Sequence, residues 1–265
     1  MNESEVIFTH LNGIKTAWYK IGTGKPLIIL HGWGSSSKAM MPLAKQLSAV
    51  RSSYLIDFPG FGESPEPPGP FSVDDYAGLI EQFIDEQEFE TVDLLVHSFG
   101  GRVALKLCTR VPVRTKIGKV LITGGAGMRP KRKPSFYFKK NLAKLLKFPF
   151  NLLPGSLRSK GLNRLRNTRL WKKLGSSDYR QLSGVMRETF VKTVSEHLDH
   201  HLSEINHEVL LLWGNDDDAT PLYQARRMEK GLKNSALVII NNAGHYAFLD
   251  KPKRFASIAE AFFTG

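Results

Sequence analysis

The chain has 265 residues, with 37 Lys and Arg against 25 Asp and Glu, and a net charge of +12 at pH 7. Its 42% hydrophobic and 23% charged residues are typical of a globular protein. The single cysteine, Cys108, excludes an intrachain disulfide. No apolar run reaches the roughly 18 residues of a membrane span, and the first residues lack a signal-peptide pattern. We therefore expect a soluble, cytoplasmic protein.

The positive charge is concentrated in one segment. Between Arg129 and Arg180 there are sixteen Lys or Arg and one acid, Asp178. The rest of the chain therefore carries a small net negative charge, which marks the basic segment as a separate module.

Strand and helix patterns alternate along most of the chain. The first two strand candidates are joined by Asn12-Gly13, the strongest short signal for a hairpin. Ser72 with Asp75 predicts a helix N-cap with its reciprocal acid. Regular alternation indicates βαβ units and a parallel sheet. The predicted strands are 6–8, 14–21, 26–30, 54–57, 94–96, 119–123, 209–213 and 237–240, and the predicted helices are about 35–50, 72–87, 100–111, 221–231 and 252–263.

The alternation is interrupted between Gly127 and about Asn206, where the pattern is helical and has no strand-like run. We predict a core domain formed by residues 1–127 and 207–265, and a helical, basic cap formed by residues 128–206. Such an insertion would lie above the carboxyl ends of the strands, where open α/β sheets bind ligands.

One serine, Ser98, stands between a buried strand and a helix. The apolar run before it ends at Val96, and Gly100-Gly101 follow it. This arrangement is close to the nucleophile elbow G-x-S-x-G, although Val96 replaces the first glycine. The alternative is an ordinary strand-to-helix turn with a bystander serine, so other segments must decide.

Two further candidates follow the serine in chain order. Asp217 lies after the seventh predicted strand and His245 after the eighth, which is the order of the α/β-hydrolase triad. Together with His31-Gly32-Trp33-Gly34 and Asp57-Phe58-Pro59-Gly60-Phe61-Gly62, these residues resemble the α/β-hydrolase superfamily, in its cap-bearing, esterase-like branch. The resemblance covers the whole sheet. It implies an α/β fold with a mostly parallel eight-stranded sheet, flanking helices and a helical cap insertion.

The resemblance implies a catalytic triad. Ser98 would be the nucleophile, His245 the base that takes its proton, and Asp217 the acid that orients the imidazole. The run Asp216-Asp217-Asp218 is ambiguous by one residue, and the family spacing Gly-x-x-Asp-x-x-x-Pro selects Asp217. We expect Asp216 and Asp218 to be solvated loop acids.

The resemblance also implies an oxyanion hole, formed by the backbone N–H groups of Trp33 and Phe99. The same two residues are the candidates for lining the substrate pocket. For the Trp33 side chain, plain packing of a large aromatic ring is the alternative interpretation.

We expect no cofactor or metal. His31 and His97 lie in motifs, but His31 is expected to order its loop and His97 to be structural. His197 and His201 are four residues apart without the Glu of an H-E-x-x-H motif, so they indicate a solvated helix face. No glycine-rich phosphate-binding fingerprint occurs.

The sequence therefore predicts a cofactor-independent serine hydrolase that cleaves a carboxylic ester or similar acyl bond. Two alternatives remain: a carbon–carbon bond hydrolase of an acidic diketone-like substrate, and a binding or receptor-like member with little turnover. For the basic cap, we consider a solvated surface, steering of an anionic acyl substrate, and peripheral docking on anionic lipid. We expect no specific nucleic-acid partner, since no base-reading module is present.

Overall fold

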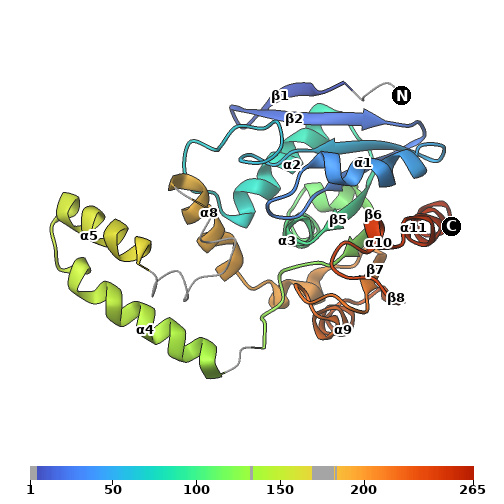
Figure 1. The fold of residues 1–265 in the computed structure, drawn as a ribbon. Helices are drawn as coiled ribbons and strands as arrows, with labels where there is room; N and C mark the ends of the chain where they lie inside the picture. Colours follow the sequence, from blue (N-terminus) through green and yellow to red (C-terminus); the bar gives the residue numbers. More distant parts are fainter. Residues whose placement is uncertain (1–4, 132–133, 169–181, 183) are drawn as a thin grey trace. The chain divides into compact units, whose positions relative to one another are not determined.

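The centre of the protein is one eight-stranded sheet (Figure 1). The computed structural model describes residues 5–131, 134–168, 182 and 184–265. The strands are β1 (Ile7–Leu11), β2 (Ile14–Ile21), β3 (Lys25–Leu30), β4 (Arg51–Ile56), β5 (Val92–His97), β6 (Ile117–Thr123), β7 (Val209–Gly214) and β8 (Ser235–Ile240). Their order across the sheet is β1-β2-β4-β3-β5-β6-β7-β8. Only β2 is antiparallel to its neighbours, β1 and β4, so the predicted α/β fold and mostly parallel eight-stranded sheet are confirmed.

Helices cover both faces of this sheet. One apolar cluster packs α1, α10 and α11 against side chains such as Ile29, Leu95 and Leu121. Alternate residues of the same strands, such as Leu94 and Val96, are buried on the opposite face, toward α2 and α3. None of the helices that the structure describes has the length and apolar character of a membrane crossing. The bounds are α1 (Ser37–Gln46), α2 (Val73–Glu86), α3 (Phe99–Leu107), α9 (Leu222–Gly231), α10 (Ala247–Asp250) and α11 (Pro252–Thr264), with short 3-10 helices at Val113–Lys116 and Asp199–Glu204.

Local sequence signals account for several element ends. The β1–β2 turn has positive φ at Asn12 (50°) and Gly13 (78°), as Asn-Gly predicts. The predicted cap of α2 is confirmed, because the hydroxyl of Ser72 accepts the N–H of Asp75 at 3.2 Å and the carboxylate of Asp75 accepts the N–H of Ser72 at 2.7 Å. Helix α3 ends at Leu107, short of the predicted 111.

The chain divides into two compact units. The larger one contains residues up to Arg129 and from Glu188 onward, and the smaller one is Pro130–Arg187. The smaller unit contains α4 (Pro134–Asn151), α5 (Gly155–Asn167) and the start of α8 (Gly184–Ser195). The side chains of residues 134–140, and all of residues 132–133, 169–181 and 183, lie outside the described part.

The predicted insertion, 128–206, extends beyond the smaller unit at its C-terminal side. Residues 188–206 cluster with the sheet instead. The hydroxyl of Thr189 accepts the N–H of Phe71 at 3.0 Å, and the N–H of Leu198 donates to Gly127 at 2.9 Å. These hydrogen bonds between distant residues attach the returning chain to the core, and periodicity along the sequence does not reveal them.

Candidate active site

Ser98 lies at a sharp turn between β5 and α3. Its backbone has φ 50° and ψ −106°, a conformation that costs a non-glycine residue roughly 1–3 kcal/mol. The backbone around it holds this turn: the N–H of Ser98 donates to Thr123 at 3.1 Å, and its carbonyl accepts the N–H of Ala126 at 2.9 Å. The serine predicted from the sequence therefore has the strained geometry of a nucleophile elbow.

The glycines after the serine allow the helix to approach the sheet, and Val96 does not prevent it. A Cβ at Gly100 would be 2.6 Å from the carbonyl oxygen of Leu30, and one at Gly101 would be 3.1 Å from Cα of Gly125. Val96 is fully buried in β5, beside Leu30 and Ile122. The turn therefore forms with valine at the first position of the motif.

His245 and Asp217 are joined directly. Nδ1 of His245 lies 2.9 Å from Oδ2 of Asp217. Asp217 is 3% exposed, whereas Asp216 and Asp218 are exposed. The structure thus brings the imidazole together with the middle carboxylate of the run and leaves the other two in solvent.

The carboxylate of Asp217 is held ionised by its partners. Oδ1 accepts the N–H of Thr220 at 2.8 Å, and the hydroxyl of Thr220 lies 2.8 Å from Oδ2. Burial would raise the pKa of Asp217, but the hydrogen bonds from His245 and Thr220 outweigh it and hold the pKa below its ordinary value. Because a carboxylate can only accept, Nδ1 of His245 carries the proton of their hydrogen bond. Thr220 was not singled out from the sequence, where only its place three residues after the acid could have drawn attention.

The segment 31–34 lies against the serine. A Cβ at Gly32 would be 3.1 Å from Cβ of Ser98. His31, which is 1% exposed, orders this segment, because its Nδ1 lies 2.8 Å from the carbonyl of Gly32 and its Nε2 accepts the N–H of Phe58 at 3.1 Å. Within the described residues, the backbone N–H groups of Trp33 and Phe99 have no protein acceptor. Both amides are therefore available as donors beside the serine.

Aromatic rings surround Trp33. Its ring centroid lies 5.4 Å from that of Phe99, 4.9 Å from Phe61 and 5.1 Å from Phe190. Phe61 belongs to the segment after β4, and Phe190 to α8. The rings form an apolar wall next to the serine that sequence proximity alone does not predict.

Ser98 and His245 both lie against the segment Thr123-Gly124. In the part of the chain that the structure describes, the hydroxyl of Ser98 is not hydrogen-bonded to His245. A Cβ at Gly124, next to the residue that accepts the N–H of Ser98, would lie 2.9 Å from Nδ1 of His245. Catalytic hydrogen bonds of this kind are often long in the absence of substrate and shorten in its complex.

Comparison with known proteins identifies the family of the chain. The sequence profile of the alpha/beta hydrolase fold family matches residues 25–252, most of the chain. The protein belongs to the α/β-hydrolase family. The hydrolase is 25% identical over 267 residues to 2-hydroxy-6-oxo-2,4-heptadienoate hydrolase of Pseudomonas putida, covering 94% of this chain and 93% of the relative. It is 27% identical over 256 residues to pimeloyl-[acyl-carrier protein] methyl ester esterase of Neisseria meningitidis, covering 91% and 94%. Among solved structures, it is similar to an esterase from Exiguobacterium antarcticum, with a TM-score of 0.75, 21% identity and coverage of 98% and 100% of the two chains.

A residue of the hydrolase that the sequence suggested to be merely structural contacts the candidate base. The ring of His97, 1% exposed, lies 4.6 Å from that of His245, and its Nε2 is 3.0 Å from the carbonyl oxygen of His245. Because that oxygen accepts, Nε2 carries the proton, and Nδ1 has no partner within the described residues. Nδ1 faces the backbone of Gly32, where a Cβ would be 2.9 Å away. Burial and the neighbouring His245 lower the pKa of His97 to about 3.

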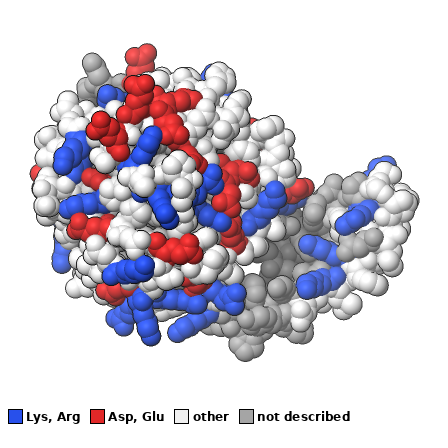
Figure 2. Space-filling view, turned by 180° about the vertical axis from the view of Figure 1, so that it is seen from behind, with Lys and Arg blue, Asp and Glu red and all other residues white. Residues whose placement is uncertain are grey.

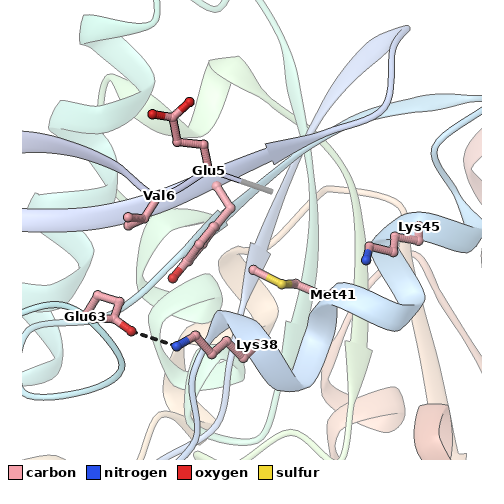
Figure 3. Close-up of a pocket in the computed structure, with 7 residues that line it drawn as sticks. Glu5, Val6, Lys38, Met41, Lys45 and Glu63 are labelled. Atoms are coloured by element: carbon pink, nitrogen blue, oxygen red, sulfur yellow. Dashed lines mark hydrogen bonds and ion pairs between the residues drawn. The ribbon is translucent and has the colours of Figure 1, made fainter. Parts of the chain in front are cut away.

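The hydrolase also has a surface cavity of about 670 Å³ between α1 and the start of the chain (Figure 3). Lys38 and Glu63 form an ion pair of 2.7 Å at its edge. None of the predicted site residues lines it. Among the described residues, no three His, Cys, Asp or Glu side chains are placed to hold a metal ion. The lining residues are Glu5, Val6, Tyr19, Lys38, Met41, Lys45 and Glu63.

Proposed function

We propose that this α/β hydrolase is a serine hydrolase that cleaves a carboxylic ester or a similar acyl bond of a small molecule. The observation that carries the proposal is the 2.9 Å hydrogen bond between His245 and Asp217, beside a serine held at φ 50°. The apolar wall around Trp33 supports an acyl group with apolar character. A cytoplasmic location is part of the same proposal, and cell fractionation tests it.

In the proposed reaction, the hydroxyl of Ser98 attacks the carbonyl carbon of the substrate. Nδ1 of His245 is bonded to Asp217, so Nε2 is the nitrogen that takes the serine proton. The carboxylate of Asp217 stabilises the imidazolium that results. Collapse of the tetrahedral intermediate, with proton return from His245 to the leaving alcohol, leaves an acyl group on Ser98. Water then attacks this ester by the same steps and releases the acid.

The backbone amides of Trp33 and Phe99 are proposed to bind the oxyanion of the tetrahedral intermediate. Loss of one such donor typically raises the barrier by about 2.7–4 kcal/mol. Ordinary substitutions do not remove a backbone N–H group, so the triad gives the sharper test.

We expect Ser98→Ala to abolish turnover of p-nitrophenyl esters and labelling by a fluorophosphonate probe, while the circular dichroism spectrum and melting temperature are retained. Ser203→Ala, an exposed serine on the same chain, is the matched control. We expect Asp217→Asn to lower kcat by about 10⁴-fold, because the imidazole loses its orienting acceptor. Asp218→Asn, in the exposed neighbour, should leave kcat unchanged. Undiminished turnover by folded Ser98→Ala would overturn the proposal.

The similarity to 2-hydroxy-6-oxo-2,4-heptadienoate hydrolase favours a second candidate, a carbon–carbon bond hydrolase of an acidic diketone-like substrate. Such a reaction would use the same residues. Comparing kcat/KM for this kind of substrate and for simple esters distinguishes the two. A third candidate, a binding member with little turnover, predicts that the fluorophosphonate probe fails to label Ser98.

A further inference from the structure

The α4–α5 hairpin of the smaller unit has an inner apolar contact of its own. A Cβ at Gly161 of α5 would overlap the ring of Phe150 of α4, so the glycine allows this ring to lie directly against α5. Phe150 and Gly161 are accordingly half-buried. Phe150 therefore supplies an apolar contact between the two helices that does not involve the exposed side chains described next.

The end of this hairpin, residues 145–157, exposes large apolar side chains, and we call it the hairpin tip. Leu152, in the turn between the helices, is 73% exposed. Isolated exposed leucines are common on proteins, but a group of five within thirteen residues is not and indicates an interaction surface. The exposed fractions are 68% for Leu145, 61% for Phe148, 73% for Leu152, 40% for Leu153 and 54% for Leu157.

The hairpin tip lies in a segment without negative charge. The sequence has no Asp or Glu from residue 130 to residue 177. Lys144, Arg158, Lys160 and Arg164 are all exposed. Figure 2, by contrast, shows acidic and basic side chains intermingled over much of the one face of the larger unit that it presents. The apolar tip is therefore flanked by cations alone.

Exposed apolar side chains flanked by cations favour one of two polyanionic partners, an anionic lipid surface, over the other, a nucleic acid. Proteins that bind single-stranded nucleic acid without sequence preference combine phosphate contacts with the stacking of bases on aromatic rings, whereas four of the five exposed side chains of the tip are leucines, which offer no ring. At an anionic lipid surface, leucine and phenylalanine enter the boundary between headgroups and acyl chains, while Lys and Arg approach the lipid phosphates. We propose that the hairpin tip docks this protein on an anionic lipid surface. The proposal does not depend on the proposed hydrolase reaction.

Co-sedimentation of the full chain with vesicles tests this proposal. We expect binding to vesicles of equimolar phosphatidylglycerol and phosphatidylcholine, weak binding to phosphatidylcholine alone, and a decrease as salt increases, because the charges are screened. Phe148→Ser with Leu152→Ser should lower the partition coefficient about tenfold or more, since two large apolar groups no longer enter the interface. Phe8→Ser, which replaces a 42% exposed phenylalanine of the sheet, is the matched control and should bind as the unaltered protein does.

A second double variant tests how much the basic side chains contribute to vesicle binding. Arg158→Gln with Lys160→Gln should weaken binding to the anionic vesicles and reduce its dependence on salt, while binding to phosphatidylcholine stays as weak as before. No binding to anionic vesicles, or equal binding by the tip variant and the unaltered protein, would overturn the proposal. A fall in melting temperature in the tip variant but not in Phe8→Ser would show that the protein itself covers these side chains, which also overturns it. Binding of single-stranded RNA, but not of vesicles, would assign the surface to nucleic acid instead.

Discussion

His97 connects the three segments that carry the candidate site. It precedes Ser98 in the chain, and its Nε2 donates a hydrogen bond to the carbonyl of His245. Its unprotonated Nδ1 faces the backbone of Gly32. Its ring also lies 4.8 Å from that of Tyr246. In the proposed reaction, we expect a residue in this place to act through the position of His245, without touching the substrate itself.

The His97 hydrogen bond can be separated from the His97 ring by two substitutions. Glutamine keeps an N–H group near the position of Nε2, whereas methionine fills similar space without a donor. We expect His97→Met to lower kcat for a p-nitrophenyl ester by about 10- to 100-fold with little change in KM, because a small displacement of the base misaligns proton transfer. His97→Gln should retain most of kcat.

The melting temperatures of the two variants provide the control. If the role of His97 were packing alone, activity would follow stability and the glutamine variant would not be rescued. Equal losses of kcat in both variants at equal melting temperature would therefore contradict a positioning role.

At the scale of the elements, the turn from β5 to α3 shows which parts of a motif are physically required. The glycine after the serine is needed because the helix passes within contact of Leu30, while Val96 occupies an ordinary buried strand position. The consensus G-x-S-x-G requires glycine at both of these positions. Only their environment in the fold shows that one of them admits a side chain.

Gly100→Ala should therefore destabilise the protein by about 1–3 kcal/mol, the range for overpacking a dense interior. Activity should fall too, since the N–H of Gly100 donates to the carbonyl of His31, at the start of the segment that contains Trp33. Urea unfolding measures the stability. Gly69→Ala, at a glycine with open space around it and no positive φ, is the matched control and should change little. An equally stable Gly100→Ala would show that helix and strand can separate at no cost.

At the scale of the whole molecule, the buried histidines make the fold sensitive to acid. His97 has a pKa of about 3 in the folded chain, against an ordinary value of 6.5. Between these values the unfolded chain binds a proton that the folded chain does not, so the free energy of unfolding decreases as the pH falls. His31 acts in the same direction, because burial also lowers its pKa. The pKa of Asp217 is lowered, so its carboxylate stabilises the fold at every pH above the ordinary pKa of an aspartate. This contribution is lost only at pH values below that ordinary pKa.

For His97 the expected slope approaches about 1.4 kcal/mol per pH unit between its ordinary pKa of 6.5 and its folded pKa of about 3. Urea unfolding at pH 7, 6, 5 and 4 measures it. His97→Gln removes the contribution of this imidazole and should show a smaller loss of stability over the same interval. A slope that is identical in the variant and in the unaltered protein would contradict the buried, neutral state of His97.

The sequence alone was enough to predict the strands and helices along the chain and a mostly parallel sheet. Alternating apolar runs, Asn12-Gly13 and Ser72 with Asp75 act over a few residues, so their structural consequences are local. The α/β-hydrolase family follows from motifs in a fixed chain order. The tertiary structure decided what depends on contacts between distant residues: the burial of Asp217 between two exposed acids, its bonds with Thr220, the contact of His97 with His245, and the attachment of residues 188–206 to the core. These features depend on which side chains come into contact after the chain has folded. The spacing of residues along the sequence does not determine these contacts.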